Sequence, residues 1–121
     1  MDIRIRTGEI EINAALNNSV TASRILKILP IKSRANTWGE EIYFMIPLIA
    51  DLEDGKEVVE AGDIAFWPTG SAFCIFFGPT PASKGDEIRP ASAVTVVGKI
   101  KGNLEILKTV KNGDPIIIER A

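Results

Sequence analysis

The chain has no histidine and no glutamine among its 121 residues, and it has a single cysteine. Without histidine there can be no His-based catalytic triad, no imidazole general base and none of the common His-containing zinc or copper sites. The lone Cys74 excludes an internal disulfide and gives no indication of an oxidising compartment. No spaced acidic loop of the calcium-binding type is present either. We therefore predict no metal and no cofactor.

The charge and hydropathy patterns exclude further classes of partner. The formal net charge at pH 7 is −2, with 25% charged and 45% apolar residues, so there is no basic excess for nucleic acid. No apolar run is long enough to span a membrane, and the opening residues alternate in character, unlike a signal peptide. Because 121 residues suit one domain with its own core, we expect a single cytoplasmic domain over residues 1–121. Its oligomeric state is left open.

The first segment, IRIRTGEIEI (residues 3–12), alternates isoleucine with charged residues and predicts a β-hairpin. A turn at Thr7-Gly8 would place arginines opposite glutamates on one face and isoleucines opposite isoleucines on the other. The pairs expected in this register are Arg6 with Glu9, Ile5 with Ile10, Arg4 with Glu11, and Ile3 with Ile12.

A helix is expected next, in NNSVTASRILKILP (residues 17–30). Asn18 or Ser19 would be the N-cap, apolar residues follow at helical spacing, and Pro30 would end the helix. A polar loop over residues 31–41 then leads to a strand, IYFMIP. Further strands are expected in AVTVVGKI and PIIIER, with a short helix near NLEILKTV between them.

The most aromatic stretch is GDIAFWPTGSAFCIFFGPTP (residues 62–81). It predicts strands at 64–67 and 72–77 around a turn at Pro68-Thr69-Gly70. The second strand is apolar on both faces, so we expect it to be covered on both sides, as in a closed barrel with other segments packed outside. Cys74 lies inside this strand without a basic neighbour in sequence, which favours an inert core thiol.

The order of these elements resembles the cyclophilin family over nearly the whole chain. VVGKIKGNLEILKTVKNGDPIIIER is similar to the closing strand, short helix and final strand of that fold, and SAFCIFFG to its aromatic core strand. In its short length the chain resembles the small cyclophilin-like proteins of bacteria and archaea. The resemblance implies a mainly β fold, namely a closed, eight-stranded, mostly antiparallel barrel with one or two short capping helices.

The chain departs from the cyclophilin pattern where prolyl isomerase chemistry would reside. Matching the family's Phe-His-Arg-hydrophobic-hydrophobic-Pro run to Pro47 puts Phe44 in the place of the arginine and Tyr43 in that of the histidine. The family's glutamine and histidine are absent altogether, and no tryptophan occurs between Gly78 and Gly98, where the family has one. The resemblance therefore implies an apolar groove without efficient isomerase activity.

Residues that could line such a groove lie in two regions. The loop SRANTWGEE brings a cation, a flat ring and adjacent carboxylates together, while the two strands contribute aromatic rings. The candidate ligand-binding residues are Arg34, Trp38, Glu40, Tyr43, Phe44 and Phe73. A structural interpretation stands beside the functional one: Arg34 pairs with a glutamate, Trp38 plugs the barrel, and Phe73 belongs to the core. Trp67, which precedes Pro68, is expected to cover a barrel end.

Three functions remain compatible with the sequence. The first is a barrel that binds a peptide or small-molecule ligand in an apolar groove. The second is a peptidyl-prolyl isomerase whose arginine, Arg34 or Arg89, is supplied from outside the usual strand. The third is a protein with a closed groove that acts through its surface or as an oligomer. A fold alone does not decide among them, and the absence of histidine and glutamine favours the first.

Overall fold

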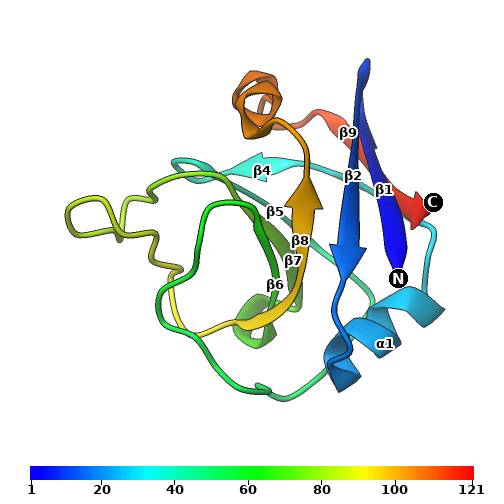
Figure 1. Cartoon of the computed structure of the whole chain (residues 1–121), viewed down its shortest axis with the longest axis horizontal. Coiled ribbons are helices and arrows are strands. Elements are labelled where there is room, and N and C mark those ends of the chain that lie inside the picture. The colour runs from blue at the N-terminus through cyan, green and yellow to red at the C-terminus, as the bar shows by residue number, and fades with distance from the viewer.

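The computed structural model describes all 121 residues, and its strands form one antiparallel sheet that nearly closes into a barrel (Figure 1). The sheet order is β3-β9-β1-β2-β8-β6-β7-β5-β4. The strands are β1 (Asp2–Thr7), β2 (Ile10–Leu16), β3 (Ile31–Arg34), β4 (Asn36–Thr37), β5 (Glu41–Met45), β6 (Asp63–Trp67), β7 (Ala72–Phe76), β8 (Thr95–Lys101) and β9 (Pro115–Arg120). The mainly β, mostly antiparallel barrel expected from the sequence is thus present.

The barrel has nine strands, not the expected eight, because residues 31–37 are not simply a polar loop. They form β3, which pairs with β9, and β4, which pairs with β5. The change of partner occurs at the buried Ala35, whose N–H donates to the carbonyl of Asp114 (2.8 Å) and whose carbonyl accepts from Gly113 (2.7 Å). The two edges of the sheet therefore belong to one stretch of chain.

The first hairpin forms, but its expected register is wrong. Thr7 pairs with Ile10 and Arg6 with Glu11, so the two-residue turn is Gly8-Glu9. Gly8 has φ +60°, and a glycine with positive φ at the first central position is what a type II′ turn requires. The shift of partner is two residues, so every side chain keeps its expected face. Ile3 and Ile5 are buried as a result.

The helix α1 (Val20–Lys27) begins after Ser19, whose hydroxyl accepts from the N–H of Ala22 (3.1 Å), as the N-cap prediction required. Its apolar side, with Ala22 and Ile25, is buried. The second expected helix is a short 3-10 segment, η2 (Leu104–Thr109). Figure 1 shows the two at opposite ends of the barrel, α1 after β2 and η2 after β8.

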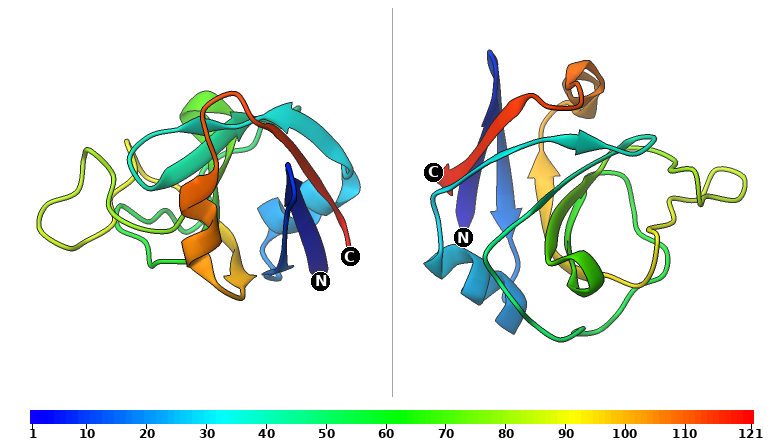
Figure 2. Two further views of the ribbon diagram at one scale, coloured as in Figure 1. Left: turned by 90° about the horizontal axis from the view of Figure 1, so that it is seen from above. Right: turned by 180° about the vertical axis from the view of Figure 1, so that it is seen from behind.

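Apolar side chains are buried on both sides of β7, as its sequence predicted. The inward residues Phe73 and Ile75 belong to the main core of 23 residues inside the barrel. The outward residues Ala72, Cys74 and Phe76 belong to a second cluster of seven residues, completed by others such as Ile88 from the loop between β7 and β8. The views in Figure 2 place that loop on the side of the barrel away from the two termini.

Candidate functional site

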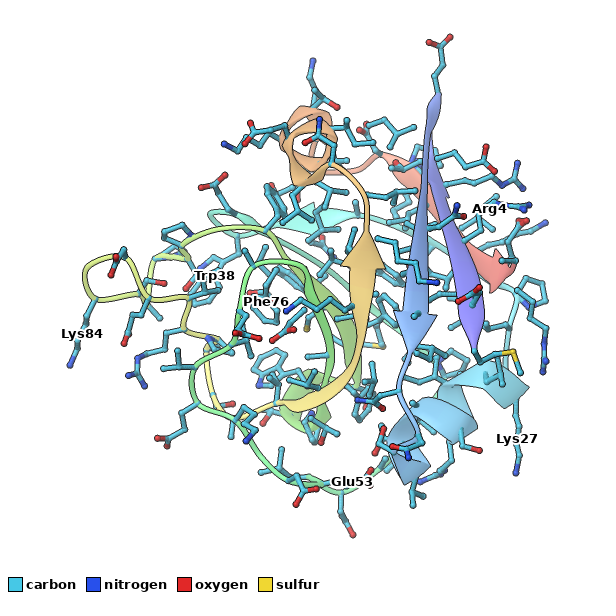
Figure 3. The ribbon with its side chains drawn as sticks, in the orientation of Figure 1. Arg4, Lys27, Trp38, Glu53, Phe76 and Lys84 are labelled. Carbon is cyan, nitrogen blue, oxygen red and sulfur yellow. The ribbon has the colours of Figure 1, made fainter.

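The candidate site lies on the outer face of the sheet, between the barrel wall and the loop that joins β7 to β8. It is a cavity of about 160 Å³. Its lining residues are Trp38, Glu41, Tyr43, Trp67, Pro90, Ala91 and Val94; we call it the Glu41 pocket. Figure 3 shows Trp38 on the side of the barrel from which the loop carrying Lys84 projects.

Sheet register explains why three of these side chains meet. Glu41 and Tyr43 are two residues apart on β5, so they point to the same face of the sheet. Trp38 is opposite Glu41 across a two-residue turn: its N–H donates to the carbonyl of Glu41 (2.9 Å), and the N–H of Glu41 donates back (3.2 Å). Residues opposite each other on antiparallel strands project from the same face. The turn therefore places the indole of Trp38 above the β5 residues.

Gly39 is required in that turn for two reasons. Its φ is +59°, a conformation that other residues adopt with strain. A Cβ atom there would also lie 2.9 Å from the carbonyl oxygen of Pro79 and 2.8 Å from Cδ of Pro81. The glycine thus lets the loop after β7 approach the turn closely, next to Trp38.

The opposite wall of the pocket is held by Trp67, at the end of β6. Its indole Nε1 donates to the hydroxyl of Ser92 (2.6 Å), which attaches the far part of the loop to the barrel. The same loop is tied at Ile88, whose carbonyl accepts from the N–H of Val59 (2.9 Å), and at Arg89, whose carbonyl accepts from the hydroxyl of Thr80. The apolar wall formed by Pro90 to Val94 is therefore anchored on both sides.

Glu41 is the only acidic or basic side chain among the lining residues. Only 6% of the residue is exposed, and no ion pair of the structure includes it. Burial raises the pKa of its carboxyl to about 7, an effect that the nearby thiol of Cys74 reduces. That thiol has one proton, and its own hydrogen bond is to the carbonyl of Ala72 (3.8 Å). The carboxyl is therefore left without a strong partner.

Cys74 itself is buried, and burial together with the charge of Glu41 raises the pKa of its thiol well above the ordinary range. Such a thiol stays protonated at neutral pH and is a poor nucleophile. The sequence prediction of an inert core cysteine agrees with this environment.

Only Trp38 and Tyr43 of the sequence candidates meet in the Glu41 pocket. Glu40, next to Glu41, points to the other face and its carboxylate lies 3.7 Å from Nζ of Lys108. Phe44 and Phe73 pair across β5 and β7 inside the main core, where their rings stack with centroids 5.3 Å apart. Neither phenylalanine lines the pocket.

The two candidate arginines also lie away from these rings. Arg34, at the end of β3, donates from Nη1 to the carbonyl of Gly113 (3.1 Å). Arg89 forms an ion pair with Glu87, with 2.7 Å between Nε and Oε2. Neither guanidinium is among the groups that line the Glu41 pocket.

The sequence placed Glu41 in the candidate loop beside Glu40 but not among the named ligand-binding residues, and it predicted that Trp67 covers a barrel end. The signal for Glu41 was its even spacing from Tyr43, which distinguishes it from its neighbour Glu40 once β5 is recognised as a strand. No comparable sequence pattern places Trp67 in the pocket. Trp67 comes close to the other rings because β6, β7 and β5 pair in the sheet, although they are distant in sequence, and because the loop after β7 packs against it.

Two wider surface depressions have a different character. One, of about 620 Å³, is mostly polar and lies beside Ser19 and Glu53; the other, of about 710 Å³, lies between α1 and the exposed Met45 and Ile49. Neither contains a buried, unpaired charge. No group of three or more acidic or cysteine side chains is placed to hold a metal ion, and no helix is long and apolar enough to cross a membrane.

Comparison with known proteins places this geometry in a family. The sequence profile described as Cyclophilin-like matches residues 1–119. A hypothetical protein from Archaeoglobus fulgidus, whose structure was determined in solution, is similar to all of this chain over 95% of its own length, with 46% sequence identity and a TM-score of 0.85. Among curated proteins, none matches significantly. On the match to almost its full length, the chain belongs to the cyclophilin-like family.

Proposed function

We propose that this protein is a binding module that takes a small ligand, or one side chain of a peptide, into the Glu41 pocket. The observation that carries the proposal is the convergence of three aromatic rings and one buried carboxyl group on a single cavity. These rings come from the β4–β5 turn, from β5 and from β6. Largely preformed, apolar cavities with a few convergent polar groups are typical of ligand sites.

Binding without rapid prolyl isomerisation fits the chemistry of the lining residues better than catalysis does. An isomerase of this kind needs a donor at the twisted prolyl amide. Apart from the indole and phenol groups and a carboxyl, the lining side chains are apolar, with no arginine or lysine among them. Arg34 and Arg89 have partners elsewhere, which weakens the alternative of a relocated arginine.

The chain provides its own reporters for the test. It has two tryptophans and one tyrosine, and all three line the Glu41 pocket. The indole N–H signals in an NMR spectrum and the tryptophan fluorescence therefore report on this cavity. We would titrate separate sets of small cationic, neutral and anionic compounds, and a proline-containing tetrapeptide, into isotope-labelled protein.

We expect at least one set to shift both indole signals, with the tetrapeptide's cis/trans exchange unchanged. If no compound shifts either indole, the proposal is wrong. If the tetrapeptide's exchange accelerates, and Arg34→Ala or Arg89→Ala abolishes the effect, the protein is an isomerase. Lys32→Ala, an exposed change on β3, is the matched control for those two variants.

A further inference from the structure

The carboxyl group of Glu41 is the feature of the pocket that least resembles ordinary packing. It is held in a largely apolar environment without an arginine or lysine partner, whereas buried charges in proteins are nearly always paired. Only two acidic residues are buried, Glu41 and Asp63. The carboxylate of Asp63 has Nζ of Lys99 at 3.3 Å. Glu41 is therefore a buried acid that lacks its cation.

The groups that face Glu41 do not supply that cation. On its own strand the neighbour is the phenol of Tyr43. From β7, the apolar Phe76 lies opposite Glu41, and the thiol of Cys74 is nearby. From β6 and from the loop after β7, the pocket receives Trp67, Pro90, Ala91 and Val94, none of which ionises. The ionised carboxylate thus makes the interior of the pocket negative.

The remaining walls suit an organic cation. The faces of tryptophan and tyrosine rings are negative, and they attract ammonium groups, most strongly where water is excluded. Two indoles and one phenol line this cavity beside the carboxylate. The same set does not suit a hard metal ion, because magnesium or calcium needs about six oxygen ligands and the pocket offers one carboxylate.

The size of the cavity limits what enters. A volume of about 160 Å³ corresponds to roughly five liquid water molecules, well below the cavities that enclose whole drug-sized ligands. It accommodates a compact head group, with the rest of the ligand outside.

We propose that the Glu41 pocket binds an alkylammonium head group, whose charge pairs with the Glu41 carboxylate and whose carbon atoms contact Trp38, Tyr43 and Trp67. The head group belongs either to a small free amine or to a lysine side chain, methylated or not. This inference rests on the proposed function and names the ligand class of the same site.

The test compares choline with its neutral carbon isostere, 3,3-dimethylbutan-1-ol, using the two indole signals and tryptophan fluorescence at constant ionic strength. We expect choline to bind roughly tenfold or more tightly than the isostere, as a charge-dependent contact worth one decade of affinity would give. Glu41→Gln is expected to weaken the binding of choline and to leave the affinity for the isostere unchanged. Glu40→Gln, whose carboxylate faces Lys108 on the other side, is the matched control and should change neither.

A second measurement does not depend on any variant. Since the pKa of Glu41 is raised to about 7, choline should bind up to roughly 100-fold more weakly at about pH 5 than at about pH 8, as the carboxyl becomes protonated. The isostere should show no such dependence. This arm remains decisive if Glu41→Gln does not fold.

A trimethyllysine tripeptide, compared with choline, identifies the source of the head group: tighter binding of either one supports the inference and shows which source applies. Equal affinity for choline and the isostere would overturn the inference while leaving the pocket a binding site. If neither choline nor the trimethyllysine tripeptide shifts the indoles but neutral or anionic compounds do, the inference also falls and the proposed function stands. If nothing shifts them, both fall.

Discussion

The carboxylate of Glu53 accepts two hydrogen bonds from Thr21, one from the backbone N–H (2.9 Å) and one from the hydroxyl (2.8 Å). Its other oxygen accepts from the N–H of Val20 (3.1 Å). A residue of the long loop between β5 and β6 thus satisfies free N–H groups in the first turn of α1, where a negative charge is favourable.

These bonds lower the pKa of Glu53 below its ordinary value. A depressed folded-state pKa means that the stabilisation is present above the ordinary pKa and is lost as the pH falls through the lowered one. We expect Glu53→Ala to lower the melting temperature at neutral pH, and the difference from the wild type to shrink near pH 3. Glu57→Ala, an exposed change on the same loop, should have little effect. A difference that does not vary with pH would contradict this origin.

The pKa of Glu41 is shifted in the opposite direction from that of Glu53. Because its folded-state pKa is raised to about 7, the folded protein binds this proton more tightly than the unfolded chain. The stability should therefore decrease as the pH rises from the unfolded pKa through about 7, by an amount on the order of 3 kcal/mol. Glu41→Gln should remove this decrease and be the more stable form at about pH 8.

Urea unfolding at about pH 5 and pH 8 measures the effect on both proteins. The comparison must be made without added amines, because bound cation would stabilise the folded wild type. If wild type and Glu41→Gln change in parallel between the two pH values, the carboxyl of Glu41 is not desolvated as described.

Gly39→Ala tests how the pocket's turn is built. The alanine would have to adopt the left-handed backbone conformation of Gly39. Its Cβ atom would also make contacts shorter than 3.0 Å with Pro79 and Pro81. Gly8→Ala is a matched control, since Gly8 has nearly the same φ and nothing within 4 Å of an added Cβ. We expect Gly8→Ala to destabilise the protein by about 1–2 kcal/mol and Gly39→Ala by more, with shifts of the indole signals only in the latter. If both variants lose the same stability, the loop after β7 moves away from the added Cβ atom at little cost in free energy.

Phe44 and Phe73 are expected to act through stability alone. Truncating either ring to alanine should lower the free energy of unfolding by about 3–5 kcal/mol, because it leaves a cavity in the core. Milder Phe44→Leu and Phe73→Leu variants should bind choline with wild-type affinity, measured by tryptophan fluorescence. Loss of binding in a folded leucine variant would restore these residues to the site.

Local patterns in the sequence predicted what depends on neighbours along the chain. The N-cap at Ser19, the turn at Pro68-Thr69-Gly70 and the two apolar faces of β7 are all confirmed. The predicted hairpin register was wrong because two different turns are compatible with the same alternation of residues. Which of the two turns forms depends on which residue takes a positive φ. Charge pairing favoured Thr7-Gly8, whereas the twist of the strands favours Gly8 at the first turn position.

The pocket required information that no short window contains. Trp38, Glu41 and Tyr43 are close in sequence, and their common face follows from strand alternation once the turn at Gly39 is known. Trp67 joins them through the pairing of β6, β7 and β5, and the wall after Pro90 joins through loop contacts. Pairing between distant strands depends on tertiary structure, which local propensity does not determine.

The change of partner at Ala35 has a consequence for association with other chains. Exposed sheet edges are templates onto which foreign strands add, and they are a common route to aggregation. Here the edge strands β3 and β4 have only four and two residues, and they follow each other along one segment. Little unpaired backbone is left for a foreign strand to extend. We therefore expect that a peptide would dock on this protein through its side chains and would not be added as a tenth strand.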